Sequence, residues 1–343
     1  MITVALDAMG GDRGLGATVA GAALLSREDA GVHTILVGDV AAISERLDQV
    51  AYEPQRLTVA AADGCVPMGA SAGAALDEAP DCSILTAARL VSDGHAQALV
   101  SAGHTGATIL AASRVFARLP GIRRAALAAV YPTEQRHGPH GDPFALMLDV
   151  GATLNATAED LAAFAVMGSA YSSIISAIDA PRVALLSNGT EPNKGTEAIV
   201  AAHQLLKGGS LNFAGNIEGL DIPRGTADVV VCDGFLGNVV LKMLEGVSDV
   251  FLDVARSASG RKLQWRMGLA MLGDGLQELK RMTDWKSYGG APLLGVDQVV
   301  IKAHGRSEER AVRNALKVAA KAVRGDLIGR TRSGISALGL GES

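Results

Sequence analysis

The sequence contains few cysteines and few aromatic residues. Its 343 residues include three cysteines, Cys65, Cys82 and Cys232, and none of them has the close paired spacing that marks a zinc site. An odd number of cysteines also argues against a disulfide framework, so we expect a reducing compartment and no metal. Aromatic residues make up 3% of the chain, whereas hydrophobic residues make up 48%. We therefore expect an aliphatic core, which is typical of a parallel sheet covered by helices.

The sequence also lacks an excess of basic residues and long apolar runs. Its formal net charge is -5, which offers no broad basic surface to a nucleic acid, and we expect no nucleic-acid partner. No uninterrupted apolar stretch reaches the roughly 18 residues of a membrane-spanning helix. Residues 2–6 are strand-like, and no signal-peptide pattern precedes them. These absences predict a cytoplasmic protein without a transmembrane segment.

Short apolar runs alternate with alanine-rich helical stretches along most of the chain. The alternation predicts a three-layer α/β/α fold with a mostly parallel sheet. We expect residues 1–330 to form a single catalytic domain. Residues 331–343 are rich in glycine and serine, which predicts a disordered tail. Strands are predicted at residues 2–6, 33–37, 98–100, 126–131, 144–150, 183–187 and 229–232.

Several predicted strands are followed by a small or acidic polar residue and then by glycine. In a parallel sheet such loops meet at one edge, where ligands of open α/β proteins bind. A single loop of this kind needs its glycine only for a tight turn, but the loops together predict a lined cleft. Backbone N–H groups at helix N-termini favour phosphate. The candidate phosphate-binding residues are Gly10, Gly11, Ser101, Gly103, Thr105, Gly106 and Lys242.

Residues 183–242 hold further polar clusters bracketed by glycine. Lys194 follows one predicted strand and precedes a helix-like stretch, so it supplies a positive charge near a helix N-terminus. Asn238 and Lys242 are four residues apart and share a helix face, where they are able to stabilise an oxyanion or bind phosphate. Asp233 is placed to orient either one. The structural alternative is an N-cap at Asn238 with a local ion pair.

Two residues of these clusters have competing interpretations. His104, between Gly103 and Thr105, either donates a hydrogen bond or a proton to a substrate or caps the turn. Cys232 would be the nucleophile of a covalent thioester route. Its place in an apolar run favours a packed core thiol instead.

Residues 238–284 predict a protruding helical hairpin, with its two helices joined at residues 257–260. Val247, Val250, Phe251 and Val254 share one face of the first helix, and Trp265 begins an apolar seam on the second. These faces need a partner, and a homodimer is the preferred interpretation. Basic residues nearby also suit a membrane surface. The candidate membrane or partner contacts are Arg261, Lys262, Trp265, Arg266 and Leu269.

Blocks of glycine and polar residues follow one another along nearly the whole chain. They occupy residues 4–12, 101–106, 189–195, 213–222, 228–242, 288–296 and 300–305. In combination they resemble the bacterial phosphate acyltransferase family of phospholipid synthesis. The sequence departs from the family pattern at His104 and Thr153, where asparagine is usual, and at Gly14-Leu15-Gly16, which replaces a start that contains proline.

The resemblance implies that a fatty acyl thioester of acyl carrier protein reacts with inorganic phosphate. The products would be free carrier protein and acyl phosphate, which feeds glycerol-3-phosphate acylation. In the implied route, phosphate near Lys194 attacks the thioester directly while Asn216 and Asn238 stabilise the oxyanion. No metal and no cofactor are implied. The basic residues of the hairpin, together with Lys280 and Arg281, would contact the acidic carrier protein.

The resemblance also implies a fold similar to that of phosphate acetyltransferases and isopropylmalate dehydrogenases. It implies a homodimer attached peripherally to the inner face of the cell membrane, within reach of a membrane glycerol-3-phosphate acyltransferase. Two alternatives stay open: a phosphate acetyltransferase-like enzyme that uses acyl-coenzyme A, and a noncatalytic scaffold that docks carrier protein at the membrane. A dinucleotide site is disfavoured because Gly-x-Gly-x-x-Gly is absent after the first predicted strand.

Overall fold

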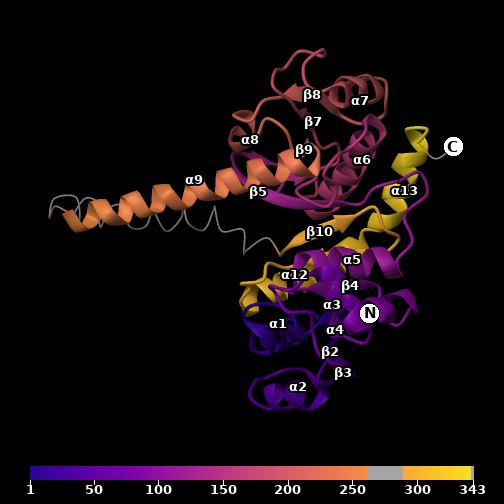
Figure 1. Ribbon diagram of the computed structural model, residues 1–343, viewed down its shortest axis with the longest axis vertical. Helices are drawn as coiled ribbons and strands as arrows, with labels where there is room; N and C mark the ends of the chain where they lie inside the picture. Colours follow the sequence, from indigo (N-terminus) through magenta and orange to yellow (C-terminus); the bar gives the residue numbers. More distant parts are fainter. Residues whose placement is uncertain (262–288, 341–343) are drawn as a thin grey trace.

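An 11-stranded sheet forms the middle layer of the protein (Figure 1). The computed structural model describes residues 1–261 and 289–340. The strand order is β3-β2-β1-β4-β11-β10-β5-β6-β9-β7-β8. The strands are β1 (Ile2–Asp7), β2 (Val32–Gly38), β3 (Leu57–Ala61), β4 (Ala98–Ser101), β5 (Ala126–His137), β6 (Asp142–Leu148), β7 (Val183–Leu186), β8 (Phe213–Ile217), β9 (Val229–Val231), β10 (Ala291–Leu294) and β11 (Val299–Lys302).

Helices connect most of these strands and cover the sheet. They are α1 (Gly14–Glu28), α2 (Val40–Leu47), the 3-10 turn η1 (Pro54–Arg56), α3 (Ala72–Glu78), α4 (Ser83–Ser92), α5 (Thr105–Val115), α6 (Ala158–Ile175), α7 (Glu197–Lys207), α8 (Asp221–Arg224), α9 (Gly234–Arg261), α12 (Glu309–Arg324) and α13 (Leu327–Ala337).

Apolar runs predict β1, β2, β4, β5, β6, β7 and β9, and the structure confirms all of them, with β5 longer than expected. The same reasoning does not predict β3, β8, β10 and β11. Gly215 and Asn216 interrupt β8, and Pro292 lies in β10. In β3 only Leu57 is buried, so its sequence has little apolar signal.

The sheet reverses direction at its centre. One parallel group contains β1, β2, β3, β4 and β11, and the other contains β6, β7, β8 and β9. Between them, β10 is antiparallel to both β11 and β5, and β5 is antiparallel to β6. The two parallel groups therefore run in opposite directions. The expectation that all polar loops meet at one edge is wrong, because it requires a single parallel group.

Helices cover both faces of the sheet, which confirms the three-layer fold. On one face, α1, α6, α7, α12 and α13 share a core cluster with alternate strand residues such as Leu6 and Ile301. On the other face, α4 and α5 pack against Ala5 and Val300, while α8 and the base of α9 pack against β6 and β9. Successive residues of a strand point to opposite faces, so each strand contributes to both layers.

The helix α9 begins earlier and continues further than the sequence predicts. It starts at Gly234, so Asn238 is not its N-cap. It also runs without a break through residues 257–260 to Arg261, because serine, alanine and a single glycine are tolerated inside a helix. The second helix of the predicted hairpin lies outside the described residues. The same is true of Lys262, Trp265, Arg266, Leu269, Lys280 and Arg281.

Beyond its base, α9 projects away from the rest of the protein (Figure 1). Leu236, Val240, Leu241 and Leu244 pack against the core. A neighbouring side of the helix carries an apolar stripe whose side chains are 48–67% exposed. The stripe residues are Phe235, Val239, Met243, Val247, Val250 and Val254.

The C-terminal segment is helical where the sequence predicts disorder. From Thr331 to Ala337 the chain belongs to α13, which corrects the expected disordered tail over these residues. The carboxylate of Asp326 accepts a hydrogen bond from the Gly329 N–H and caps the helix. Gly334 packs so closely on α6 that an added Cβ would lie 2.6 Å from Val166. Small residues therefore serve close helix packing here.

A buried ionic cluster aligns the start of β9 with its neighbours. The Asp228 carboxylate accepts hydrogen bonds from His137 Nδ1 at 2.5 Å and from the Arg182 backbone N–H at 2.6 Å. The Arg182 guanidinium donates two further hydrogen bonds to this carboxylate, at 3.0 and 3.1 Å. Burial acts to raise the pKa of Asp228, but the contacts with His137 and Arg182 outweigh it and hold the pKa well below its usual value. The cluster thus connects the end of β5 with the starts of β7 and β9.

We expect Asp228→Asn to lower the free energy of unfolding by about 3 kcal/mol or more, because it leaves buried partners without their counter-charge. Urea denaturation followed by circular dichroism measures this loss. The difference from wild type should begin to shrink below about pH 4, where the Asp228 carboxyl of the unfolded chain takes up a proton while the native carboxyl, with its lowered pKa, stays ionised. The matched control is Asp81→Asn, which breaks an exposed pair with Arg89 and should cost less than about 1 kcal/mol. Equal losses of unfolding free energy in the two variants would show that the buried cluster stabilises the fold no more than an exposed ion pair does.

Candidate active site

A cavity of about 450 Å³ lies where the two halves of the sheet meet. Its lining comes from the centre of the sheet, the first turns of α9, and the segments that follow β4, β6 and β11. Leu127, Val130, Val150, Leu154 and Phe235 give it an apolar wall. A cavity of this volume accommodates a small molecule or part of a larger one.

The same cavity has polar side chains in its lining, Thr105, Asn238, Lys242, Lys302 and His304. Thr105, Lys302 and His304 follow strands of one parallel group, whereas Asn238 and Lys242 follow a strand of the other. The structure thus brings loops from opposite-running strands around one space. An apolar wall beside amide and ammonium groups suits a ligand with a hydrocarbon part and a polar or anionic part.

Asp233 fixes the start of α9. Its Oδ1 accepts a hydrogen bond from the Leu236 N–H at 2.8 Å, so the aspartate caps the helix. Asn238 and Lys242 then lie on the helix face that lines the cavity, as their spacing of four residues predicts. Asp233 does not belong to the described lining residues. The hydrogen bond between Asp233 and the Leu236 N–H therefore positions the helix that carries Asn238.

Gly237 allows α9 to lie directly on the loop that follows β6. A Cβ at this position would lie 1.9 Å from the backbone oxygen of Asp149. The buried Asp149 carboxylate in turn accepts backbone hydrogen bonds from Leu127 and from residues 151–153. Burial raises the pKa of Asp149, and these hydrogen bonds act in the opposite direction. The loop is therefore a rigid seat for the first turn of α9.

Lys302 and His304 are cavity residues that the sequence analysis does not select. Lys302 ends β11 and is 6% exposed. Burial lowers its pKa to about 8, while the charges of Asp7 and Asp12 act to raise it. Burial and the positive charges of Lys302 and Arg306 lower the pKa of His304. A lysine that directly ends a buried apolar run is a sequence signal for such a residue, because lysine is almost never buried without a function or a partner.

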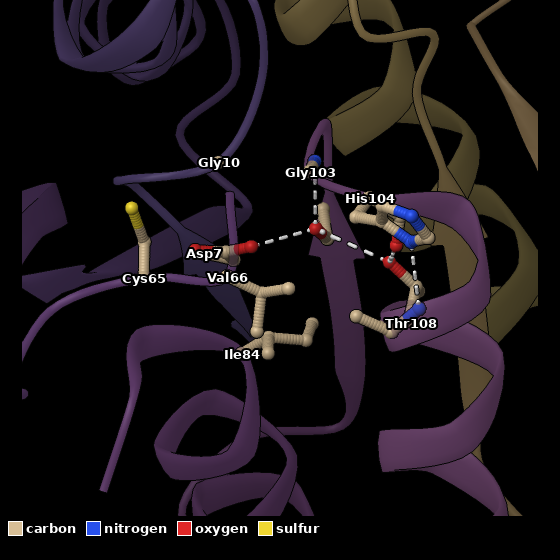
Figure 2. Close-up of a pocket in the computed structure, with 10 residues that line it drawn as sticks. Asp7, Gly10, Cys65, Val66, Ile84, Gly103, His104 and Thr108 are labelled. Atoms are coloured by element: carbon tan, nitrogen blue, oxygen red, sulfur yellow. Dashed lines mark hydrogen bonds between the residues drawn. The ribbon is translucent and has the colours of Figure 1, made fainter. Parts of the chain in front are cut away.

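A much smaller cavity, of about 10 Å³, lies beside Asp7 (Figure 2). The Asp7 carboxylate accepts hydrogen bonds from the hydroxyls of Ser83 at 2.6 Å and Ser101 at 2.7 Å. Burial raises the pKa of Asp7, and these two hydroxyls act to lower it. Gly10 and Gly103 also line the cavity, which has room for about one water molecule. Gly10, Ser101 and Gly103, which are predicted to bind phosphate, therefore lie around the Asp7 carboxylate. That they bind phosphate stays a prediction.

His104 caps α5. Its Nδ1 accepts a hydrogen bond from the Ala107 N–H at 3.2 Å, which realises the capping role that the sequence leaves open. The next residue, Thr105, begins α5 and lines the large cavity. The backbone N–H groups of this helix start, including that of Gly106, have no partner one turn earlier within the helix.

Asn216 lies in the edge strand β8, and Lys194 lies in the loop that follows the neighbouring strand β7. The buried Asn216 amide donates a hydrogen bond to the Glu191 carbonyl at 2.9 Å, and its oxygen contacts His203 Nδ1 at 3.0 Å. Asn216 thereby holds the loop that carries the exposed Lys194. Neither residue is among the described lining residues of the large cavity. The structure brings Asn238 and Lys242 to one cavity, whereas Asn216 contacts the loop that carries Lys194.

Cys232 is a core thiol, as the sequence predicts. It is 2% exposed, and its Sγ donates to the Asp149 carbonyl at 3.4 Å. Burial raises the pKa of this thiol, and the charges of Asp233 and Asp149 raise it further. A thiol held in its protonated form is a poor nucleophile. Cys82 is also buried, whereas Cys65 is exposed.

Within residues 1–261 and 289–340, no group of three or more histidine, cysteine, aspartate or glutamate side chains is placed to hold a metal ion. No helix in the same part of the chain has the length and apolar character needed to cross a membrane.

Comparison with known proteins identifies the family. A family model described as fatty acid synthesis protein matches residues 2–330. The chain belongs to this family. Its curated relatives include the phosphate acyltransferase of Moorella thermoacetica, 40% identical over 95% of this chain and 93% of the relative. The phosphate acyltransferase of Myxococcus xanthus is 42% identical over 92% of this chain and 88% of the relative.

Solved structures of proteins with low sequence identity to this chain share its fold. A phosphotransacetylase from Streptococcus pyogenes superposes with a TM-score of 0.62 at 20% identity, with 94% of each chain covered. The EutD phosphotransacetylase from Staphylococcus aureus gives a TM-score of 0.59 at 17% identity, with 93% of each chain covered. These similarities confirm the fold that the sequence resemblance implies.

Thiol labelling tests the burial of Cys232. We expect one cysteine, the exposed Cys65, to react rapidly with a thiol reagent such as dithionitrobenzoate in the native protein. Cys82 and Cys232 should react only after denaturation. In Cys65→Ser the rapid phase should disappear. Rapid labelling of Cys232 in that variant, located by peptide mass spectrometry, would show that its thiol is accessible and would reopen the covalent route.

Proposed function

We propose that the protein is a phosphate acyltransferase, which converts fatty acyl-[acyl carrier protein] and inorganic phosphate to acyl phosphate and free carrier protein. The observation that carries this proposal is the 450 Å³ cavity, in which an apolar wall lies beside Asn238, Lys242 and Lys302. The family match and the phosphate acyltransferase relatives support the same activity. Acyl phosphate would feed glycerol-3-phosphate acylation in phospholipid synthesis.

In the proposed reaction a phosphate oxygen attacks the thioester carbonyl carbon. The new C–O bond gives a tetrahedral intermediate, and its collapse breaks the C–S bond. The pantetheine thiolate leaves with the carrier protein and takes up a proton. The buried, protonated Cys232 supports direct attack by phosphate instead of an acyl-enzyme. The main tasks of the site are then to position two substrates and to stabilise the oxyanion.

Asn238 is the proposed oxyanion-stabilising residue, because its amide lines the cavity from the first turns of α9. Asp233 positions it through the helix cap. Lys194 is a second proposed catalytic residue, and Asn216 positions the loop that carries it. His104 acts through the start of α5, which it caps. An amide fixed by the fold stabilises developing negative charge without reorganisation during the reaction.

Phosphate is proposed to lie between the start of α5 and the face of α9 that carries Lys242. Thr105 and Lys242 line the cavity from these two sides. The N-terminus of a helix favours an anion through its N–H groups and its dipole. In this proposal Gly10, Gly11, Ser101 and Gly103 shape the backbone that leads to Thr105, and Gly106 contributes an N–H group.

The apolar stripe of α9 is proposed to bind a second copy of the chain. Exposed large apolar side chains in one row usually mark an interaction surface. A symmetric dimer would bring the stripes of two copies together. Arg261 ends the described part of α9, and the neighbouring basic and apolar residues of the sequence are proposed to contact a membrane surface or the acidic carrier protein. Such contact would place the enzyme on the inner face of the cell membrane, near a membrane glycerol-3-phosphate acyltransferase.

The runner-up function is a phosphate acyltransferase that uses acyl-coenzyme A. The shared fold with phosphotransacetylases favours keeping this alternative, because it offers the same thioester and phosphate chemistry. The two functions differ only in the carrier of the acyl group. A test with both donors separates them.

Incubation of the pure protein with palmitoyl carrier protein and phosphate should produce palmitoyl phosphate, detected by mass spectrometry or as a hydroxamate. The expected kcat/KM with carrier protein exceeds that with palmitoyl-coenzyme A, because a protein donor makes additional contacts outside the cavity. The reverse preference would support the coenzyme A enzyme. Acyl phosphate from neither donor would leave only the noncatalytic scaffold.

Replacement of Asn238 by alanine is expected to lower kcat about 10²- to 10³-fold, since one preorganised oxyanion donor is lost. Lys194→Ala should also lose most turnover. Asn212→Ala and Lys207→Ala serve as matched controls, because both exposed residues lie beside the amino end of β8, at the other edge of the sheet from the loop that carries Lys194. Both controls should keep wild-type rates. Wild-type rates in a folded Asn238 or Lys194 variant would remove that residue from the mechanism.

A further inference from the structure

Lys302 occupies a central position in the sheet. It ends β11, where it is paired with Ser101 of β4 on one side and with Ala291 of β10 on the other. Strand alternation places Lys302 on the same face as Val300, which packs with α4 and α5. Asp7 ends β1 on this face as well, because it alternates in the same way with Ala5. The ammonium and the carboxylate therefore belong to one side of the sheet, where the large cavity lies.

The Lys302 ammonium is nearly buried but incompletely bonded. The residue is 6% exposed and still lines the 450 Å³ cavity. Its Nζ donates one hydrogen bond, to the carbonyl oxygen of Ala303. No ion pair joins it to another described residue. An ammonium has three donors, so two stay available to a ligand. A buried charge without a partner is costly, and a ligand of opposite charge removes that cost.

Two other lysines are weaker candidates for the same task. Lys194 is exposed and does not line the described cavity. Lys242 lines the cavity but is exposed, so solvent and salt screen its charge. Lys302 acts from a position with little water, where the attraction between unlike charges is several times stronger. Of these three lysines, it is the one whose position favours tight contact with an anion.

We propose that Lys302 binds the inorganic phosphate that attacks the acyl thioester, and that it is a catalytic residue of this enzyme. This inference rests on the proposed function. The two available N–H groups would donate charge-assisted hydrogen bonds to phosphate oxygens, across the cavity from Asn238. Lys302 then holds the nucleophile while Asn238 stabilises the oxyanion that forms. When the C–S bond breaks, the thiolate carries one negative charge away, so the acyl phosphate beside Lys302 has one negative charge fewer than the tetrahedral intermediate.

The charge of Lys302 depends on pH in the range of enzyme assays. Burial lowers its pKa to about 8, so the ammonium is present below pH 8 and is lost as the pH rises through this value. Phosphate affinity should fall in the same direction. The charged and titratable groups that face Lys302 are Asp7 and Asp12 near the end of β1, His304 and Arg306 after β11, and Lys242 and Glu245 on α9.

The test measures initial rates at saturating acyl donor with phosphate varied, between pH 6.5 and 9.5. In Lys302→Met we expect the KM for phosphate to rise about 10- to 100-fold, because charged hydrogen bonds are lost. The KM for the acyl donor should change less than about threefold. In wild type the KM for phosphate should rise with pH above about 8, whereas Lys302→Arg keeps its charge and should show no such rise. Lys317→Met is the matched control, since Lys317 forms an exposed pair with Glu28.

A binding measurement without acyl donor separates this inference from the proposed function. Phosphate should raise the thermal unfolding midpoint of the wild type and of Lys317→Met, because a ligand of the native state stabilises it. Lys302→Met should lose this rise. An unchanged KM and an unchanged phosphate-dependent shift in folded Lys302→Met would overturn the inference. If Lys302→Met does not fold, an Arg variant with the pH profile of wild type would overturn it equally. If the wild type forms no acyl phosphate, the proposed function is refuted instead. The phosphate-dependent rise of the unfolding midpoint would then still test whether Lys302 binds phosphate.

Discussion

The reversal of strand direction at β10 and β5 is the constraint on which the site depends. Polar loops follow the carboxyl ends of strands in both parallel groups, and a single parallel sheet would line them along one edge. Here the two groups run in opposite directions and meet at two antiparallel central strands. Lys302 and Thr105 therefore approach the cavity from one half, and Asn238 and Lys242 from the other. Lys302, proposed to bind phosphate, and Asn238, proposed to stabilise the oxyanion, thus come from separate halves and line one cavity.

Each half also buries an aspartate at the end of a strand, but the two carboxylates have different surroundings. Asp149 accepts backbone N–H groups from Leu127 and residues 151–153, so its hydrogen-bonding capacity is taken up by the loop that it shapes. Asp7 accepts two hydroxyls and acts on Lys302 through its charge. Burial raises the pKa of both groups. Asp149 therefore keeps rigid the loop on which α9 rests. Asp7 helps to keep the Lys302 ammonium charged beside the cavity.

Sequence reasoning succeeds where local patterns decide and fails where distant pairing decides. Buried apolar runs predict most of the sheet, and a spacing of four residues places Asn238 and Lys242 on one helix face. Lys302 is missed although it directly ends an apolar run, because the burial of its ammonium depends on the position of β11 between β4 and β10, which local sequence does not encode. Asn216 is predicted as an oxyanion-stabilising amide, and the structure shows that its amide holds the loop that carries Lys194. Its role in the reaction stays a prediction. Glycine and serine near residue 334 look like a disordered tail, although their small size serves close packing on α6.

The length of α9 has a mechanical consequence. The helix has 28 residues and is thus about 42 Å long, and its first turn rests on the Asp149 backbone with no space for even one methyl group at Gly237. A stiff rod seated so tightly at one end behaves as a lever. A load on its outer, apolar portion produces a torque that the core contacts of Leu236, Val240, Leu241 and Leu244 must resist. Asn238 lies within this anchored part, so the helix that presents its amide to the cavity is also the one that would carry such a load.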